Sequence, residues 1–267
     1  MDSRDRLLQK DEINYRNLNP LQIQHPCRLT SVGKTDSGKT YAIIKHILLD
    51  ANVPFDRIVW CAPQASLEQA KIKALKKQLG SKLILVDGLN EEMLQDIVER
   101  KPYKEQMCIV LDDLIHSSGA SKFVNNLFTS GRHKNISIVE ILQRIYTGSK
   151  DARTHRLNSE YFMLHSFSDQ SEIERLMRSL IRRGVDRADE LMQAYNSSVS
   201  KNKERGFLLV DLKATPEHNY LRYRDNALDQ AWCKPSNRQT GGGFNDFDQA
   251  ISGISKGFNM VWAPFMK

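Results

Sequence analysis

Short apolar runs alternate with amphipathic stretches along most of the chain. Several of the runs are apolar at nearly every position, which is typical of strands covered on both faces of a sheet. We expect strands at Cys27–Val32, Arg57–Cys61, Lys82–Val86, Met107–Leu111, Ile136–Leu142, Tyr161–Phe167 and Gly206–Leu212. The stretches between them repeat apolar residues at helical spacing, and we expect helices at Thr40–Leu49, Leu67–Leu79, Glu91–Glu99, Ser121–Ser130, Gln170–Ile181 and Arg187–Tyr195.

This alternation predicts an α/β fold whose mostly parallel central sheet is covered by helices on both faces. We expect one domain over residues 25–228, preceded by a polar N-terminal arm (1–24) and followed by a flexible linker (229–243). An aromatic tail (244–267) has apolar residues three or four apart, as in an amphipathic helix. It could dock on a neighbouring subunit or capsid protein, or equally pack on its own domain. A membrane-surface helix is a weaker alternative, because the tail has few basic residues.

Composition narrows the class of protein and suggests the charge of its partner. The 267 residues have a formal net charge of +7, an isoelectric point near 9.2 and a mean hydropathy of −0.51. The positive surplus suits a polyanionic partner. No apolar stretch approaches the roughly 18 residues of a spanning helix, and the first residues do not resemble a secretory signal. The four scattered cysteines indicate reduced core thiols in a reducing compartment.

The first chemical motif is a glycine-rich loop between an expected strand and an expected helix. Gly33, Lys34, Thr35, Asp36, Ser37, Gly38, Lys39 and Thr40 match G-x-x-x-x-G-K-[ST], the Walker A pattern. The backbone N–H groups of such a loop and the helix N-terminus point at a phosphate. We expect Lys39 to neutralise the β- and γ-phosphates of ATP, and the Thr40 hydroxyl to ligate Mg²⁺.

The second motif is an acidic pair at the end of an apolar strand. Asp112 and Asp113 follow Cys108–Leu111. Mg²⁺ needs a fixed oxygen ligand on the side of the site away from the loop. We therefore expect Asp112 to hold the metal and Asp113 to be the general base that polarises the attacking water. Two further strands fit between Thr40 and Asp112, so we expect another strand to separate or flank the two motif strands.

Two more residues complete the candidate site. Gln143 ends the next strand, where its amide could touch both the γ-phosphate and the lytic water. Arg132 lies in a cluster of cations with no obvious carboxylate partner in the sequence. It could reach the γ-phosphate of a neighbouring subunit as an arginine finger, or it could simply be a solvated helix end.

These motifs, taken in order, resemble the poxvirus-type genome-packaging ATPases of the FtsK–HerA superfamily. The resemblance covers about residues 25–228 and includes the late segments Gly206–Leu212 and Leu221–Arg224. It implies a P-loop NTPase of RecA/FtsK-like fold that uses ATP and Mg²⁺ to move double-stranded DNA into a preformed capsid. It further implies a homo-oligomeric ring, with a hexamer favoured, capsid protein partners, and a location in the virion or viral factory. Many motor ATPases end this strand in Asp-Glu, so Asp113 is a shorter base than usual.

Basic residues after the expected sensor strand are candidates for DNA contact, because a translocase grips phosphates without reading bases. They form three groups: Lys150, Arg153, His155 and Arg156; Arg175, Arg178, Arg182, Arg183 and Arg187; and Lys201, Lys203 and Arg205. Carboxylates, among them Glu172, are interleaved with the second group, so that helix could instead be a salt-bridged solvent face. The loop groups are therefore favoured.

Two other functions remain open. A nucleotide kinase shares the glycine-rich loop, but the glutamine at position 143 and the intervening strands count against it. A nucleotide-bound structural subunit of a capsid vertex would keep the same loop and Asp112 while hydrolysing ATP too slowly to drive movement. The motifs are compatible with either a motor or such a lock.

Overall fold

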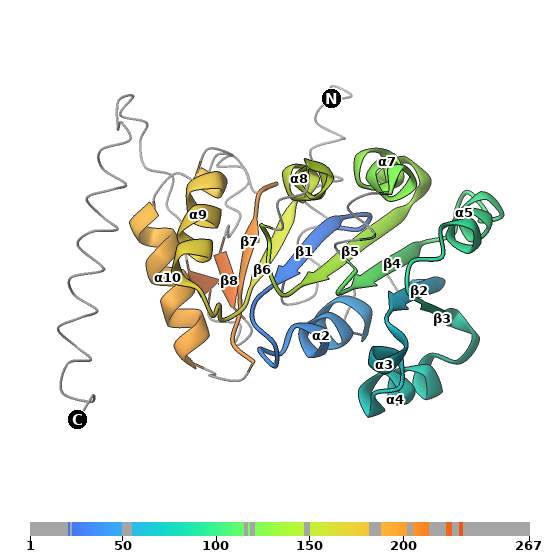
Figure 1. Cartoon of the computed structure of the whole chain (residues 1–267), viewed down its shortest axis with the longest axis horizontal. Helices are drawn as coiled ribbons and strands as arrows, with labels where there is room; N and C mark the ends of the chain where they lie inside the picture. The colour runs from blue at the N-terminus through green and yellow to red at the C-terminus, as the bar shows by residue number, and fades with distance from the viewer. Residues whose placement is uncertain are drawn as a thin grey trace, which may run out of the picture.

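The computed structural model describes residues 21, 23–49, 55–114, 117, 121–146, 150–181, 188–201, 205–213, 223–225 and 230–231. The expected arm therefore lies almost wholly outside the described residues, and the expected linker and tail lie outside them apart from 230–231. The described chain forms one nine-stranded sheet with the order β3-β2-β4-β5-β1-β6-β7-β8-β9 (Figure 1). The six strands from β3 to β6 in this order are parallel. The last three join antiparallel.

The strands are β1 (Arg28–Val32), β2 (Arg57–Ala62), β3 (Leu83–Asp87), β4 (Met107–Asp112), β5 (Ile136–Leu142), β6 (Tyr161–Leu164), β7 (Leu208–Asp211), β8 (Tyr223–Asp225) and β9 (Gln230–Ala231). The helices are α2 (Lys39–Ala42), which continues as the π-helix η1 (Ile43–Leu49), α3 (Gln64–Leu67), α4 (Ala70–Leu79), α5 (Glu91–Glu99), α7 (Lys122–Ser130), α8 (Lys150–Asn158), α9 (Gln170–Ile181) and α10 (Ala188–Lys201). Two short 3₁₀ helices are η2 (Gly80–Lys82) and η3 (Gly131–Lys134).

Most expected elements are present, and the expected mostly parallel α/β fold is confirmed. The single helix expected over Leu67–Leu79 is wrong, because Gln69 adopts an extended conformation and a second helix begins at Ala70. The strand expected over Tyr161–Phe167 ends at Leu164, where the chain turns beneath the glycine-rich loop. The first basic group, which was expected in a loop, lies in α8.

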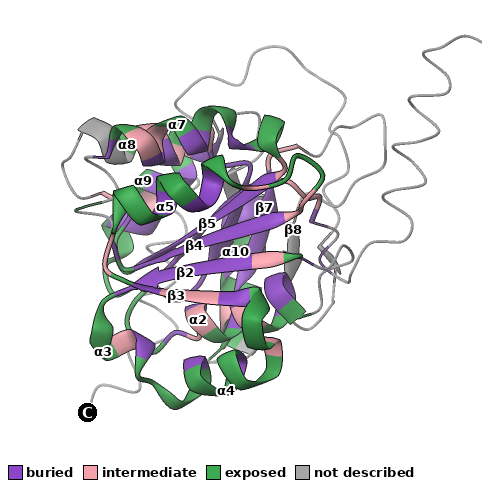
Figure 2. Ribbon diagram, turned by 90° about the vertical axis from the view of Figure 1, so that its right-hand side faces the viewer, coloured by how far each residue is buried: buried purple, intermediate pink, exposed green. Residues whose placement is uncertain are grey.

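Alternate residues of each central strand enter different cores, as a sheet covered on both faces requires. One face packs against α2, η1, α3 and α4, and its core contains Ile43, Ile72 and Trp60. The other face packs against α5 and α7 around Phe128, and against α9 and α10 around Leu176. Figure 2 shows buried strands between helices whose outer sides are exposed.

Helices α5 and α7 begin where the sequence supplies a side-chain cap. Asn90 accepts a hydrogen bond from the backbone N–H of Met93 at 3.0 Å, and Ser121 accepts one from Val124 at 3.0 Å. Such caps satisfy N–H groups that have no partner within the helix. The capped ends fix where each amphipathic helix meets the sheet.

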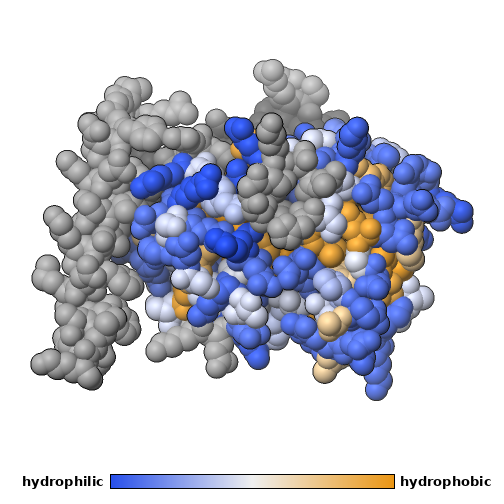
Figure 3. All heavy atoms as spheres, in the orientation of Figure 1, coloured by the Kyte–Doolittle hydropathy of each residue, from blue (hydrophilic) through white to orange (hydrophobic). Residues whose placement is uncertain are grey.

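The face seen in Figure 3 is hydrophilic over α4 and α5, with hydrophobic residues along the strip between them. Cys27, Cys61 and Cys108 are free and buried, as expected for core thiols, and Cys233 lies outside the described residues. No helix within the described ranges is long and apolar enough to cross a membrane.

Candidate nucleotide site

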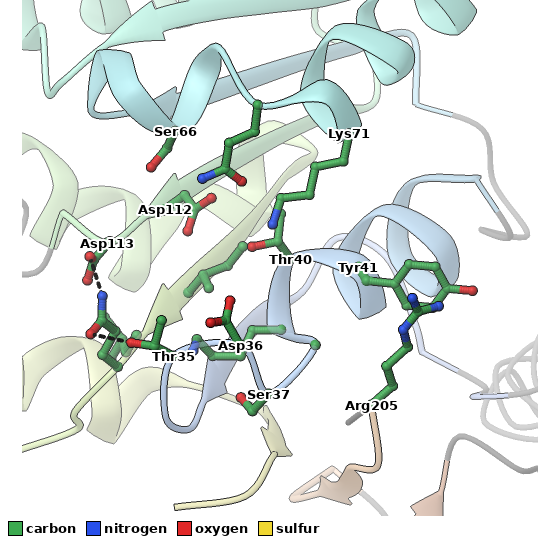
Figure 4. Close-up of a pocket in the computed structure, with 16 residues that line it drawn as sticks. Thr35, Asp36, Ser37, Thr40, Tyr41, Ser66, Lys71, Asp112, Asp113 and Arg205 are labelled. Atoms are coloured by element: carbon green, nitrogen blue, oxygen red, sulfur yellow. Dashed lines mark hydrogen bonds between the residues drawn. The ribbon is translucent and has the colours of Figure 1, made fainter. Parts of the chain in front are cut away.

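The glycine-rich loop and the acidic pair lie at one edge of the sheet because their strands are parallel. β5 lies between β1, which precedes the loop, and β4, which ends in Asp112. The spacing of the motifs predicts that another strand separates or flanks the two motif strands, and β5 separates them. A cavity of about 650 Å³ opens at this edge (Figure 4). Its lining comprises Thr35, Asp36, Ser37, Gly38, Lys39, Thr40, Tyr41, Ser66, Gln69, Lys71, Asp112, Asp113, Ile141, Leu142, Gln143 and Arg205.

The loop is anchored to the ends of two neighbouring strands. The N–H of Gly33 donates to the carbonyl of Leu142 at 3.2 Å, and the N–H of Lys34 donates to the carbonyl of Ser166 at 2.8 Å. Gly38, with a φ of 85°, holds the left-handed conformation that turns the loop into α2. These constraints fix the loop at the N-terminus of α2, where phosphate binding is favoured.

Lys39 is held by the backbone of its own loop. Its Nζ donates to the carbonyl of Gly33 at 2.7 Å and to that of Lys34 at 2.6 Å. Burial lowers the pKa of Lys39, and the nearby carboxylates of Asp112 and Asp113 oppose this shift. The Lys39 ammonium therefore lies among the loop carbonyls, near the two carboxylates. A phosphate oxygen bound at the loop could replace its contacts with the carbonyls.

Asp112 presents a mostly buried carboxylate to the same cavity. Burial raises its pKa to about 6, against the opposing effects of Lys71 and Lys39. A bound divalent cation would relieve this destabilised charge, since oxygen ligands suit Mg²⁺ and one or two protein ligands suffice beside a nucleotide's phosphates. Thr40 lines the same cavity and supplies a hydroxyl. The two residues expected to hold Mg²⁺ therefore fit it in donor chemistry.

Gln143 links the glycine-rich loop to the acidic pair. Its Nε2 donates to Oδ2 of Asp113 at 2.7 Å, and its Oε1 accepts from the Thr35 hydroxyl at 3.1 Å (Figure 4). The three side chains come from the loop after β1, the end of β4 and the end of β5. One amide therefore contacts both the glycine-rich loop and the candidate base.

The backbone turns sharply at Asp113, and its side chain lies against the amide of Gln143. The φ of Asp113 is 59°, in the left-handed region that Asp and Asn enter more readily than most residues. Its N–H donates to the carbonyl of Ile141 at 3.0 Å, which ties the turn to β5. The carboxylate is exposed at the cavity, as a base that polarises water must be.

His165 contacts the backbone of the glycine-rich loop, and it was not among the residues expected at the site. The ring is fully buried; its Nδ1 lies 3.0 Å from the carbonyl of Ser37 and its Nε2 lies 3.2 Å from Oγ of Ser31. A carbonyl only accepts, so Nδ1 carries the proton and Nε2 accepts from Ser31. Burial lowers the pKa of His165 to about 3, and this keeps the ring neutral. A histidine directly after the apolar run Tyr161–Leu164 was the available signal.

Four more lining residues lie outside the motifs. Ser66 comes from α3, Gln69 from the break between α3 and α4, Lys71 from the first turn of α4, and Arg205 from the turn before β7. The guanidinium of Arg205 lies 4.4 Å from the centroid of the Tyr41 ring. Arg205 was expected among DNA-contacting residues, but the structure brings it to the nucleotide cavity. No local pattern marks these residues, because their proximity depends on strand order.

Arg132 lies far from the cavity of its own chain. It belongs to η3, which precedes β5, whereas Gln143 follows that strand, and seven residues of strand span about 23 Å. The sequence shows no obvious carboxylate partner near Arg132, but the structure brings one from a distant position. The Nη1 of Arg132 lies 3.8 Å from Oε1 of Glu160, which also forms a 2.7 Å ion pair with the buried Arg28. Half of the Arg132 side chain remains exposed.

The first basic group is only partly available to DNA. The expectation for His155 is wrong, because its ring is fully buried, stacks on Phe128 at 4.1 Å and lies 2.8 Å from Glu140. Arg156 is half-buried and its guanidinium lies 4.5 Å from the centroid of the Tyr146 ring. Arg153 is exposed. The side chain of Lys150 lies outside the description.

Arg175 and Arg178 of the second basic group lie on α9 together with Glu172, a buried carboxylate. The guanidinium of Arg175 lies 4.0 Å from the centroid of the Tyr146 ring, the same ring that Arg156 contacts. Arg178 is exposed. Glu172 is buried and accepts a 2.6 Å hydrogen bond from the N–H of Ile145, so it does not belong to a solvent face. Arg182, Arg183 and Arg187 of this group lie outside the described residues, as do Lys203 and the side chain of Lys201 in the third group.

Comparison with solved structures places this fold among NTPases. The genome packaging NTPase B204 from Sulfolobus turreted icosahedral virus 2 matches with a TM-score of 0.51 and 13% identity, over 72% of this chain and 94% of that one. The DNA-packaging ATPase B204 from Sulfolobus Turreted Icosahedral Virus gives 0.47 and 12%, over 71% and 94%. ATPases 2 and 3 of EssC from Geobacillus thermodenitrificans give 0.42 and 13%, over 57% and 34%.

No family model and no curated protein matches the chain. At this level of identity the first similarity shows the fold alone. The chain has an α/β NTPase fold, which agrees with the resemblance to viral packaging ATPases drawn from its motifs.

Proposed function

We propose that this chain is an ATP-driven translocase that packages double-stranded viral DNA into a preformed capsid. The observation that carries the proposal is the bridge from Thr35 through Gln143 to Asp113. A nucleotide-binding fold needs only the loop, whereas this bridge joins the phosphate site to the candidate base. A structure with the same fold is described as a genome packaging NTPase, and the net charge of +7 suits a DNA partner.

The residues of the site have distinct roles in this proposal. The loop N–H groups bind the phosphates of ATP, and Lys39 exchanges its carbonyl partners for phosphate oxygens. Thr40 and Asp112 hold Mg²⁺, whose charge stabilises the transferred phosphoryl group. Asp113 accepts a proton from the attacking water while Gln143 fixes the orientation of that carboxylate. The protein acts in a homo-oligomeric ring, with a hexamer favoured, that docks on a capsid protein.

Steady-state ATP hydrolysis tests the proposal, with and without long double-stranded DNA, at low and moderate salt. We expect a several-fold stimulation by DNA that weakens as salt rises, because phosphate contacts release counterions. Lys39→Ala should abolish nucleotide binding and the stimulation, whereas Lys73→Met, an exposed change on α4, should preserve both. Tight ATP binding without any DNA response would instead support a nucleotide-locked structural subunit.

A further inference from the structure

Lys71 is the one lysine of α4 that lines the nucleotide cavity. The helix also carries Lys73, Lys76 and Lys77, and none of these three is among the lining residues. Lys76 is engaged elsewhere, since its Nζ donates to the carbonyls of Gly80 and Leu83. Lys71 therefore differs from the other lysines of α4 in where its side chain lies.

The break before α4 accounts for this position. Gln69 is extended and Ala70 begins the helix, so Lys71 lies in the first turn and faces the cavity. Ile72 and Leu75 of the same helix are buried in the core, which fixes the helix against the sheet. The backbone at Lys71 is therefore held in place by the packing of α4.

The ammonium of Lys71 extends toward the residues proposed to hold the metal. Figure 4 shows Lys71 reaching down from α4 toward Thr40, with Asp112 nearby. Lys71 forms no hydrogen bond or ion pair with any residue that the structure describes. Its charge acts on the Asp112 carboxylate more strongly than that of Lys39.

The charges of the cavity indicate what Lys71 binds. The charged lining residues are the cations Lys39, Lys71 and Arg205 and the anions Asp36, Asp112 and Asp113. These charges balance, so an entering nucleotide brings excess negative charge that a cation without a close partner can meet. Arg205 is stacked on Tyr41, and Lys39 is held by the loop. Lys71 is the cation that is free to move onto the incoming phosphates.

We propose that Lys71 binds the terminal phosphates of the nucleotide directly, as a second lysine supplied from α4 in addition to Lys39. This inference rests on the proposed nucleotide site and identifies a residue that the motifs do not include. It predicts that α4 responds to the number of phosphates, since a nucleotide with fewer phosphates brings less negative charge to Lys71. It requires neither DNA nor a ring.

Equilibrium binding of ATP, ADP and AMP in the presence of Mg²⁺ tests this inference with the full chain. We expect Lys71→Met to weaken ATP binding about tenfold or more, as loss of a charge-assisted hydrogen bond implies, and to leave AMP binding within about twofold. Lys71→Arg should retain most of the ATP affinity. Methionine is a good helix former, and Lys73→Met is the matched control on the same helix.

Three results would overturn the inference. ATP affinity of Lys71→Met equal to that of Lys73→Met would mean that Lys71 does not reach the phosphates. Equal weakening of all three nucleotides would indicate a general distortion of the site. Tighter ATP binding would mean that Lys71 only competes with Mg²⁺ for Asp112. Because no DNA is added, a failure of DNA-stimulated hydrolysis would remove the translocase proposal without affecting this measurement.

Discussion

The side-chain amide of Gln143 donates to Oδ2 of Asp113 over 2.7 Å, although the two residues are 30 positions apart. β4 and β5 are adjacent and parallel, so their ends place the two side chains together. The other end of the same amide accepts from Thr35 of the glycine-rich loop. The amide therefore couples the phosphate loop to the candidate base, and the first two predictions concern this coupling.

Asp113→Asn should stop hydrolysis and preserve ATP binding. Asparagine tolerates the left-handed φ of 59° at this position and can still contact Gln143, so the fold and the loop should be unchanged. Loss of a general base lowers the turnover rate by about 10²–10⁴. Single-turnover hydrolysis and equilibrium ATP binding measure the two effects. Turnover within a few-fold of the parent protein would show that the base lies elsewhere.

Gln143→Ala should lower the turnover rate by about tenfold or more, because Asp113 loses the group that orients it. Thr35→Val removes only the hydrogen bond from the loop and should have a smaller effect. Steady-state kinetics with ATP separate changes in kcat from changes in KM. Gln78→Ala, an exposed glutamine of α4, serves as the matched control. Equal rates for Gln143→Ala and Gln78→Ala would contradict a role for the bridge.

Gly33→Ala should displace the loop, because a Cβ at Gly33 would lie 2.6 Å from Cβ of His165 and 2.9 Å from the carbonyl oxygen of Ser166. Such overpacking costs about 1–3 kcal/mol in the free energy of unfolding. Gly131→Ala is the control, since its Cβ would meet neighbours only at 3.7 Å or more. Chemical denaturation should show a lower free energy of unfolding for Gly33→Ala than for Gly131→Ala, and ATP should bind Gly33→Ala more weakly. A Gly33→Ala protein as stable as Gly131→Ala would contradict the close approach.

His165→Gln should reduce the dependence of stability on pH. Burial lowers the folded-state pKa of His165 to about 3, whereas the ordinary pKa of histidine, which applies to the unfolded chain, is 6.5. Between these values the unfolded state binds one more proton, so the free energy of unfolding falls as pH falls. One such group contributes about 1.4 kcal/mol per pH unit.

Chemical denaturation at several values between pH 5 and pH 6 tests this expectation. The slope for the parent protein should exceed that for His165→Gln by about 1.4 kcal/mol per pH unit. His25, whose pKa burial lowers to about 4, contributes to both proteins and cancels in the difference. Identical slopes would show that His165 is charged in the folded protein or titrates normally.

Arg132→Ala should recover hydrolysis when it is mixed with Lys39→Ala subunits. Arg132 lies at the opposite end of β5 from the cavity of its own chain, so it can act only on a neighbour's nucleotide. A mixed ring would pair an intact loop with an intact arginine at some interfaces. Each variant alone is the control. Co-assembled mixtures that stay inactive at every ratio would remove the proposed finger in trans.

The sequence by itself determined the local elements and the motif residues. The helices over Glu91–Glu99 and Gln170–Ile181 have the expected bounds, because their apolar spacing is set within one element. The loop at Gly33 and the strand that ends at Asp112 are equally local features. The spacing of these motifs predicted that another strand would separate or flank the two motif strands, and β5 separates them.

Tertiary structure decided which distant side chains meet. The contact of His165 with Ser37, the approach of Lys71 to the cavity and the burial of His155 beside Glu140 all depend on strand order and on the packing of helices across the sheet. A basic or polar residue has the same sequence signal whether it faces solvent, a ligand or a buried partner. Periodicity records which face of an element is apolar, whereas only the assembled sheet determines what lies opposite that face.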